Sequence, residues 1–217
     1  MSDRSDPGAL LTLYFSPGAC SRVSLIALEE AGATYRAQPV VLARGEHSTA
    51  EFRSLNPKGR VPVLVTGEGV LTETVAILAW LAQRFPAAAL LPASDPWAQA
   101  QALSLLSWCA SGLHPLIFRA RMPQRVCDLP DAAGRVQALA CAELAAQLQV
   151  AEDRLECGPW LAGARWSVAD AYLFWAWGRA CDAGIAPEAF PRLREHAGRM
   201  ALRPSVQRAL LREATPD

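Results

Sequence analysis

The chain changes character near residue 86, and this change constrains its fold more than any other feature of the sequence. Before that point, short β-like runs alternate with segments whose apolar residues recur at helical spacing. After it, the periodic segments are all helical. We therefore expect a small α/β unit over residues 10–85, a linker over 86–95 and an all-helical unit over 96–212. An α/β domain followed by an all-α domain is the fold class that this pattern predicts.

The α/β half has the predicted order β-α-β-α-β-β-α. We expect strands at 10–15, 35–42, 61–65 and 70–72, and helices at 21–31, 48–55 and 73–85. The last two strands form a predicted hairpin, since a Gly-rich turn separates them.

The helical half carries clear helix-start signals. Asp95-Pro96 places an N-cap and a first-turn proline before a helix that runs to about residue 111. Ser167 and Asp170 form an S-x-x-D capping box before an apolar run. Further helices are expected at 131–156 and from Pro191 and Pro204.

Charge and composition exclude several classes of function. The chain has 21 Lys and Arg against 21 Asp and Glu, so it lacks the basic excess of a nucleic-acid-binding protein. No apolar run reaches the roughly 18 residues of a spanning helix, and the N-terminus has no signal-peptide core. We expect a cytoplasmic protein with no nucleic-acid or membrane partner. The six cysteines form no C-x-x-C pair and the three histidines are isolated, so we expect free thiols and no metal.

Cys20 lies between a predicted strand and a predicted helix. A thiol at a helix N-terminus feels the positive end of the helix dipole, which favours the thiolate and lowers the pKa. The Cys20 thiol, or the neighbouring Ser21 hydroxyl, could also donate a hydrogen bond to a bound thiolate. The alternative is that Cys20 only fills the first helical turn, as free cysteines usually do.

Two further features follow in the α/β half. Pro62 interrupts a strand-like run, and a cis Val61-Pro62 bond would present the Val61 backbone to an extended peptide. An ordinary trans proline at a strand start is the alternative. Thr72-Glu73-Thr74 begins a helix, where free amides suit a carboxylate and the Glu73 side chain suits an ammonium group. The alternative there is an acid that only complements the helix dipole.

In this order, and on the predicted β-α-β-α-β-β-α arrangement, the motifs resemble those of the glutathione transferases. The segment 13–21 is similar to the signature of the bacterial beta class, 56–62 to the family's cis-proline segment and 71–77 to its γ-glutamyl-binding motif. The segment 166–174 is similar to its capping-box region, which makes Asp170 a structural cap. The resemblance covers about residues 10–212. It implies a thioredoxin-like first domain and a homodimeric, cytoplasmic detoxification enzyme.

The resemblance also implies roles for individual residues. Val61 and Pro62 would meet the cysteinyl part of glutathione, with the bond between them cis, while Glu73 and Thr74 would hold the γ-glutamyl end. Cys20 would lie beside the glutathione sulfur, where it can form a mixed disulfide, and His114 would reach the site from the helical domain. The remaining histidines, 47 and 196, are expected at the surface.

The sequence departs from the class at the positions of two lysines. Pro115 follows the expected active-site histidine, and Arg44 or Gly45 stands where a second lysine is usual. Thr74 also replaces a more usual serine or glycine. We therefore expect Arg44 to bind the glycyl carboxylate, with weakened affinity. Lys58 is the only lysine among the 21 basic residues, which we attribute to coding bias.

The predicted function is transfer of the glutathione thiolate to a small hydrophobic electrophile, with Cys20, Ser21 and His114 as catalytic residues. The electrophile pocket is expected between the domains and lined by Phe15, Leu113, Ile117, Phe118 and Trp175. One alternative is a glutathione-dependent thiol–disulfide or peroxide reductase that uses Cys20. The other is a non-catalytic carrier of apolar ligands.

Overall fold

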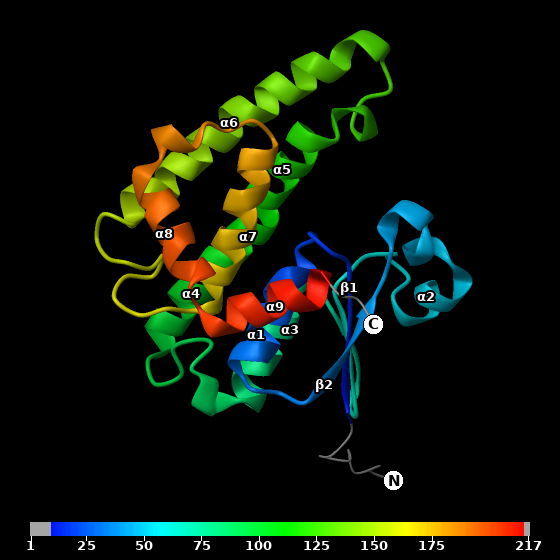
Figure 1. Cartoon of the computed structure of the whole chain (residues 1–217), viewed down its shortest axis with the longest axis vertical. Helices are drawn as coiled ribbons and strands as arrows, with labels where there is room; N and C mark the ends of the chain where they lie inside the picture. Colours follow the sequence, from blue (N-terminus) through cyan, green and yellow to red (C-terminus); the bar gives the residue numbers. More distant parts are fainter. Residues whose placement is uncertain (1–9, 215–217) are drawn as a thin grey trace. The chain divides into compact units, whose positions relative to one another are not determined.

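The computed structural model describes residues 10–214 of the 217-residue chain. It divides into two compact units (Figure 1). The first holds the described residues up to Leu90 together with those from Arg203 onward, and the second is Leu91–Leu202. The helical unit therefore ends at Leu202 and not at residue 212 as expected, because residues 203–212 belong with the first unit.

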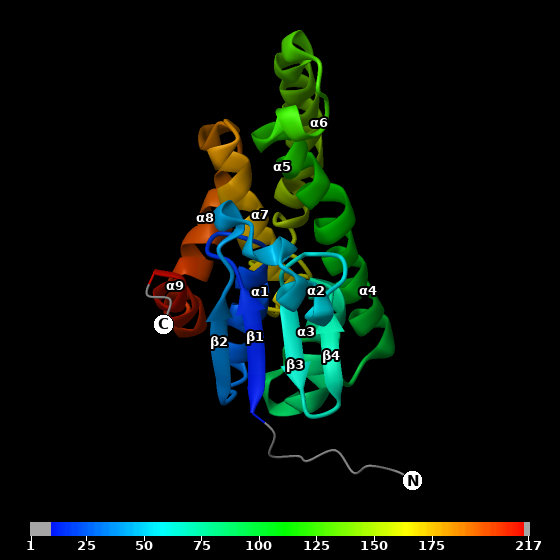
Figure 2. The same cartoon turned by 90° about the vertical axis from the view of Figure 1, so that its right-hand side faces the viewer.

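The first unit has the predicted order of strands and helices. Its strands are β1 (Leu11–Phe15), β2 (Tyr35–Pro39), β3 (Val63–Thr66) and β4 (Gly69–Thr72), and its helices are α1 (Ser21–Glu30), α2 (Ala50–Leu55), α3 (Thr74–Arg84) and α9 (Pro204–Ala214). The sheet order is β2-β1-β3-β4 (Figure 2). Strand β1 pairs parallel with β2 and antiparallel with β3, while β3 and β4 form the antiparallel hairpin.

Side-chain alternation along β1 explains how the helices cover this sheet. Leu13 and Phe15 are fully buried, whereas Tyr14 between them points to the opposite face. Figure 1 shows α1 and α3 on one face of the sheet and α2 on the other. On the α2 face, Phe52 packs with Val63 in a small apolar cluster that Tyr14 joins. Strand β1 is therefore covered on both faces, whereas the edge strand β4 is partly exposed.

Helix α9 is held against α1 by charge. The buried Glu29 carboxylate of α1 accepts hydrogen bonds from Arg208 Nε (2.8 Å), from Arg212 and from the Tyr35 hydroxyl (2.7 Å). Burial by itself would raise the pKa of Glu29, but these three donors outweigh it and hold the pKa below its ordinary value. The local pattern of residues 204–214 predicts a helix, but it contains no sign of this partner about 180 residues away.

The second unit is helical, as predicted. Its main helices are α4 (Pro96–Trp108), α5 (His114–Arg121), α6 (Ala133–Arg154), α7 (Val168–Asp182) and α8 (Pro191–Ala201). Asp95 caps α4 by accepting from the backbone of Trp97 (2.9 Å) and Ala98 (3.2 Å), with Pro96 at the first position. A π-helical turn, Cys109–Leu113, joins α4 to α5, so α4 ends at Trp108 and not at about residue 111 as expected.

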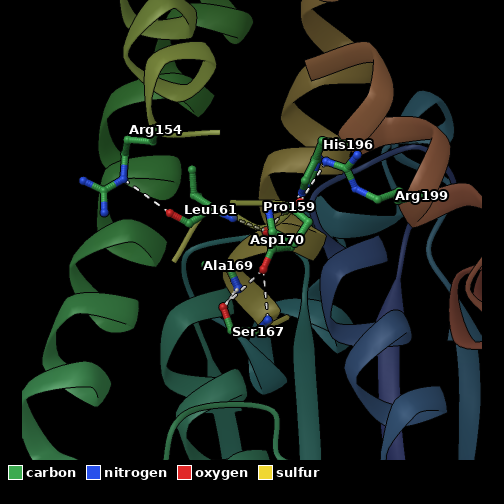
Figure 3. Close-up of polar contacts among 8 residues, drawn as sticks. All are labelled: Arg154, Pro159, Leu161, Ser167, Ala169, Asp170, His196 and Arg199. Atoms are coloured by element: carbon green, nitrogen blue, oxygen red, sulfur yellow. Dashed lines mark hydrogen bonds and ion pairs between the residues drawn. The ribbon is translucent and has the colours of Figure 1, made fainter. Parts of the chain in front are cut away.

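The Ser167–Asp170 capping box is present at the start of α7 and extends further than predicted (Figure 3). Asp170 Oδ2 accepts from the Ser167 amide (2.9 Å), and Oδ1 accepts from the Leu161 amide (2.7 Å) and from His196 Nε2 (3.0 Å). His196 is fully buried, so the expectation that it lies at the surface is wrong. His47 is half-buried and also departs from that expectation.

Candidate functional site

The β1–α1 loop places Cys20 at the N-terminus of α1, where the sequence predicts it. The Ser21 hydroxyl closes this loop, because it accepts from the Ser16 amide (3.0 Å) and donates to the Ser16 carbonyl (3.2 Å). Ser21 is fully buried. Its hydroxyl therefore takes part in the hydrogen bonding of the loop, and its donation to a bound thiolate stays a prediction.

Three distant segments of the chain meet at the Cys20 sulfur. The thiol donates to the Val61 carbonyl oxygen, 3.8 Å away, and it accepts from the Thr74 hydroxyl at 4.0 Å. Val61 precedes β3 and Thr74 begins α3. The structure thus brings together Cys20, Val61 and Thr74, which the sequence assigned to one site.

The Val61-Pro62 peptide bond is cis, which confirms the prediction. Pro62 is buried directly before β3, while Val61 is half-buried. The preceding turn is organised by the buried Asn56, whose side chain donates to the Arg60 carbonyl (2.7 Å) and accepts from the Lys58 amide (3.2 Å). The cis-proline segment is therefore tied to the end of α2.

Burial raises the pKa of Cys20 to about 11, and the hydrogen bond from Thr74 offsets only part of this effect. The nearby Glu73 carboxylate adds to the rise. The expectation that the helix N-terminus lowers this pKa is wrong, because loss of hydration outweighs the dipole for a thiol that is almost fully buried. Burial at this position therefore disfavours the thiolate form of Cys20.

Glu73 occupies the connection between β4 and α3, and its backbone has a φ of 72°. A positive φ is costly for a residue with a side chain and is often found at functional sites. The neighbouring Thr74 is buried, whereas the Glu73 side chain is 68% exposed. The connection therefore directs one polar group inward, to Cys20, and presents a carboxylate to solvent.

Sequence reasoning missed the partner of Glu73. Lys58 Nζ forms an ion pair with the Glu73 carboxylate and donates to the Thr72 hydroxyl at 2.8 Å. The sequence did contain a signal for this partner, because Lys58 is the only lysine in the chain, but we attributed that to coding bias. Arg44, which the sequence analysis assigned to the glycyl carboxylate, ends a short 3-10 segment after β2 and is exposed.

His114 belongs to the second unit and begins α5. Its Nδ1 lies 3.2 Å from the Tyr172 hydroxyl, and its ring centroid lies 4.6 Å from that of Trp175, nearly perpendicular to it. Both partners project from α7. The imidazole is therefore held in a fixed orientation by α7.

The side chains expected to line an electrophile pocket are mostly buried. Phe15, Leu113, Ile117 and Trp175 are buried, and Phe118 is half-buried. Leu113 and Ile117 are four residues apart and so share the inward face of a helix. That these side chains line an electrophile pocket stays a prediction.

Neither a membrane-spanning helix nor a metal-binding cluster is found in the described part of the chain. None of its helices combines the length and apolar character that a bilayer requires. Within residues 10–214, no three His, Cys, Asp or Glu side chains gather as metal ligands would.

Comparison with known proteins agrees with this architecture. The family model of the glutathione S-transferase N-terminal domain matches residues 17–84, and that of the C-terminal domain matches residues 118–204. Glutathione S-transferase GstA of Escherichia coli O157:H7 is 32% identical, over 94% of this chain and 98% of the relative. Maleylacetoacetate isomerase of Pseudomonas aeruginosa is 32% identical, over 92% and 94%. Disulfide-bond oxidoreductase YfcG of Escherichia coli is 30% identical, over 96% and 98%.

Solved structures agree as well. A glutathione transferase homologue from Sulfitobacter with bound glutathione has a TM-score of 0.85 and 33% identity, covering 92% of this chain and 96% of its own. A sphingomonad glutathione S-transferase in complex with glutathione has a TM-score of 0.83 and 35% identity, covering 94% and 98%. Since the relatives match over nearly their whole length, the chain belongs to the glutathione transferase family.

Proposed function

We propose that the protein conjugates the thiolate of glutathione to small hydrophobic electrophiles. One observation carries this proposal: the Cys20 thiol is buried between the Val61 carbonyl and the Thr74 hydroxyl, a position at which burial raises its pKa. A neutral, buried thiol is a poor nucleophile but a hydrogen-bond donor. The nucleophile is therefore best supplied by the co-substrate, and Cys20 serves it as a donor.

The first unit offers a group for each part of glutathione. The Val61 backbone, beside the Cys20 sulfur, would pair with the cysteinyl residue of the tripeptide. The Glu73 carboxylate would bind the γ-glutamyl ammonium group, while the N-terminus of α3 at Thr74 would bind the adjacent carboxylate. Arg44 would bind the glycyl carboxylate. Two structures of related proteins contain glutathione, which supports this choice of ligand.

The proposed chemical step needs no group beyond the two substrates. The glutathione sulfur, having lost its proton to solvent, forms a carbon–sulfur bond with the electrophilic carbon. The leaving group departs with its bonding electrons, for example as chloride. The Cys20 S–H and the dipole of α1 would favour the thiolate before attack. His114 is predicted to assist, and its orientation by Tyr172 is consistent with a fixed role.

Glutathione-dependent disulfide reduction is a second candidate, favoured by the 30% identity to a disulfide-bond oxidoreductase. In that reaction two glutathione molecules reduce one disulfide and become glutathione disulfide. If Cys20 takes part, its thiolate attacks the substrate disulfide and releases one thiol, and a first glutathione thiolate then displaces the second thiol to give a Cys20–glutathione mixed disulfide. The second glutathione thiolate attacks the glutathione sulfur of that mixed disulfide, which releases Cys20 and forms glutathione disulfide. The raised pKa of Cys20 favours conjugation over this role.

We also propose that the protein is cytoplasmic and that it forms a homodimer. Sedimentation analysis would test the oligomeric state.

Two assays separate the candidates. The first uses 1-chloro-2,4-dinitrobenzene with glutathione, and the second uses 2-hydroxyethyl disulfide with glutathione. We expect conjugation by the wild type and only a modest loss in Cys20→Ala. Cys157→Ala, which removes an exposed cysteine of the second unit, is the matched control. Absence of conjugation by the folded wild type would refute the proposed function, and absence of both activities would favour the apolar-ligand carrier.

A further inference from the structure

Lys58 and Glu73 form an exposed ion pair beside the cis-proline segment. The ammonium nitrogen of Lys58 contacts the Glu73 carboxylate at Oε1 and the Thr72 hydroxyl at 2.8 Å. Both side chains are open to solvent, at 48% for Lys58 and 68% for Glu73. Ion pairs with this exposure contribute little to folding stability. The pair is therefore better explained by what it does to the position of Glu73.

The backbones on both sides of the pair are fixed. Lys58 lies in the turn that Asn56 organises through its side-chain hydrogen bonds to Lys58 and Arg60. Gly59 follows with a φ of +60°, and a Cβ there would meet the His47 carbonyl oxygen at 3.0 Å. On the other side, Glu73 is held between β4 and α3. The two side chains could still rotate, and the contacts of Lys58 with Glu73 and Thr72 restrain both of them.

The type of cation suits this task. Lys58 is the single lysine among 21 basic residues, and every other basic position is arginine. An ammonium group is a compact donor, which allows one nitrogen to reach oxygens on two consecutive residues, Thr72 and Glu73. Since Oε1 faces Lys58, Oε2 is left for a second donor.

We propose that Lys58 is a positioning residue for glutathione binding: it orients the Glu73 carboxylate so that Oε2 meets the γ-glutamyl ammonium group. This inference rests on the proposed function. Lys58 acts through Glu73 and makes no contribution of its own to the chemical step. Its removal should raise the KM for glutathione and leave kcat at saturating glutathione unchanged, because the interaction is made equally in the ground and transition states.

A double-mutant cycle tests the proposal by calorimetry with glutathione. We expect Lys58→Met to weaken binding about fivefold, the scale of an exposed ion pair. Lys58→Met should add almost nothing in a Glu73→Gln background, because the two residues act as a unit. Arg36→Met, which removes an exposed positive charge from β2 of the same unit, is the control and should bind as the wild type does.

Two glutathione analogues locate the contact. With glutaryl-cysteinylglycine, which lacks the α-amino group, wild type and Lys58→Met should bind equally. With 4-aminobutyryl-cysteinylglycine, which lacks the α-carboxylate, the fivefold difference should persist. Additive effects in the cycle, tighter binding by Lys58→Met, or loss of the difference only with the second analogue would overturn the positioning role. Failure of the wild type to bind glutathione would overturn the proposed function with it, whereas unchanged binding by Lys58→Met overturns this inference alone.

Discussion

His196 Nε2 of α8 lies 3.0 Å from Asp170 Oδ1 of α7, and both side chains are fully buried. The same oxygen accepts from the Leu161 amide (2.7 Å), so one carboxylate joins α7 to α8 and to the segment before α7 (Figure 3). A buried carboxylate is stable only when donors surround it. The capping residue of α7 is thus also a link between elements of the helical unit.

Asp170→Ala should destabilise the protein by about 3 kcal/mol, because it removes hydrogen bonds to a charged group and leaves the buried His196 and Leu161 donors without an acceptor. The midpoint temperature of thermal unfolding should fall by roughly 6–12 °C for a chain of this length. Asp182→Ala, at the exposed end of the same helix, should change the free energy of unfolding by less than about 0.5 kcal/mol. Equal stability of Asp170→Ala and wild type would show that this network is not formed.

Glu73→Gln should weaken glutathione binding about tenfold while the fold is retained, since it removes the negative charge offered to the γ-glutamyl ammonium group. Calorimetry on the folded variant measures the change. Glu68→Gln, in the exposed turn of the β3–β4 hairpin, is the control and should bind normally. An unaltered dissociation constant for Glu73→Gln would place the ammonium contact elsewhere.

Cys20 should react slowly with iodoacetamide at pH 7 and faster as the pH rises toward 11, because only the thiolate is alkylated and burial raises its pKa to about 11. The exposed Cys157 should react first at neutral pH. Peptide mapping by mass spectrometry at several pH values distinguishes the two sites. Preferential alkylation of Cys20 at pH 7 would restore the reactive-thiolate hypothesis and, with it, the reductase candidate.

Glu29→Gln should destabilise the first unit by about 2 kcal/mol at pH 7, since the neutral amide cannot receive the Arg208, Arg212 and Tyr35 donors as the carboxylate does. The folded-state pKa of Glu29 lies below its ordinary value of 4.5. Its contribution is therefore complete above the unfolded-state pKa and is lost as the pH falls through the folded-state pKa.

Urea unfolding between pH 3 and 7 checks this sign. The difference in stability between wild type and Glu29→Gln should shrink as the solution becomes acidic. Glu51→Gln, an exposed position on α2, should behave as the wild type at every pH. A difference that stays constant over this range would mean that lost packing, and not the charge, accounts for the effect.

The sequence by itself determined the order of strands and helices in the α/β unit and the starts of α4, α7, α8 and α9, because the signals that distinguish them are local, but it did not predict α5 (His114–Arg121). The alternation of Leu11, Leu13 and Phe15 and the helix-start signals at Asp95 and Ser167 need only nearby residues to act. The site motifs around Cys20, Val61 and Thr74 were also visible as segments, and their convergence followed from the fold that they resemble.

Only the tertiary structure decided the state and partners of the polar groups. The pKa of Cys20 depends on how much water the surrounding chain excludes, and no local pattern reports that desolvation. The hydrogen bonds between Ser21 and Ser16 depend on the folded loop, so the sequence contained no sign of them. Glu29 meets α9 and Asp170 meets His196 across long stretches of chain, and such pairs form only when packing brings their elements together.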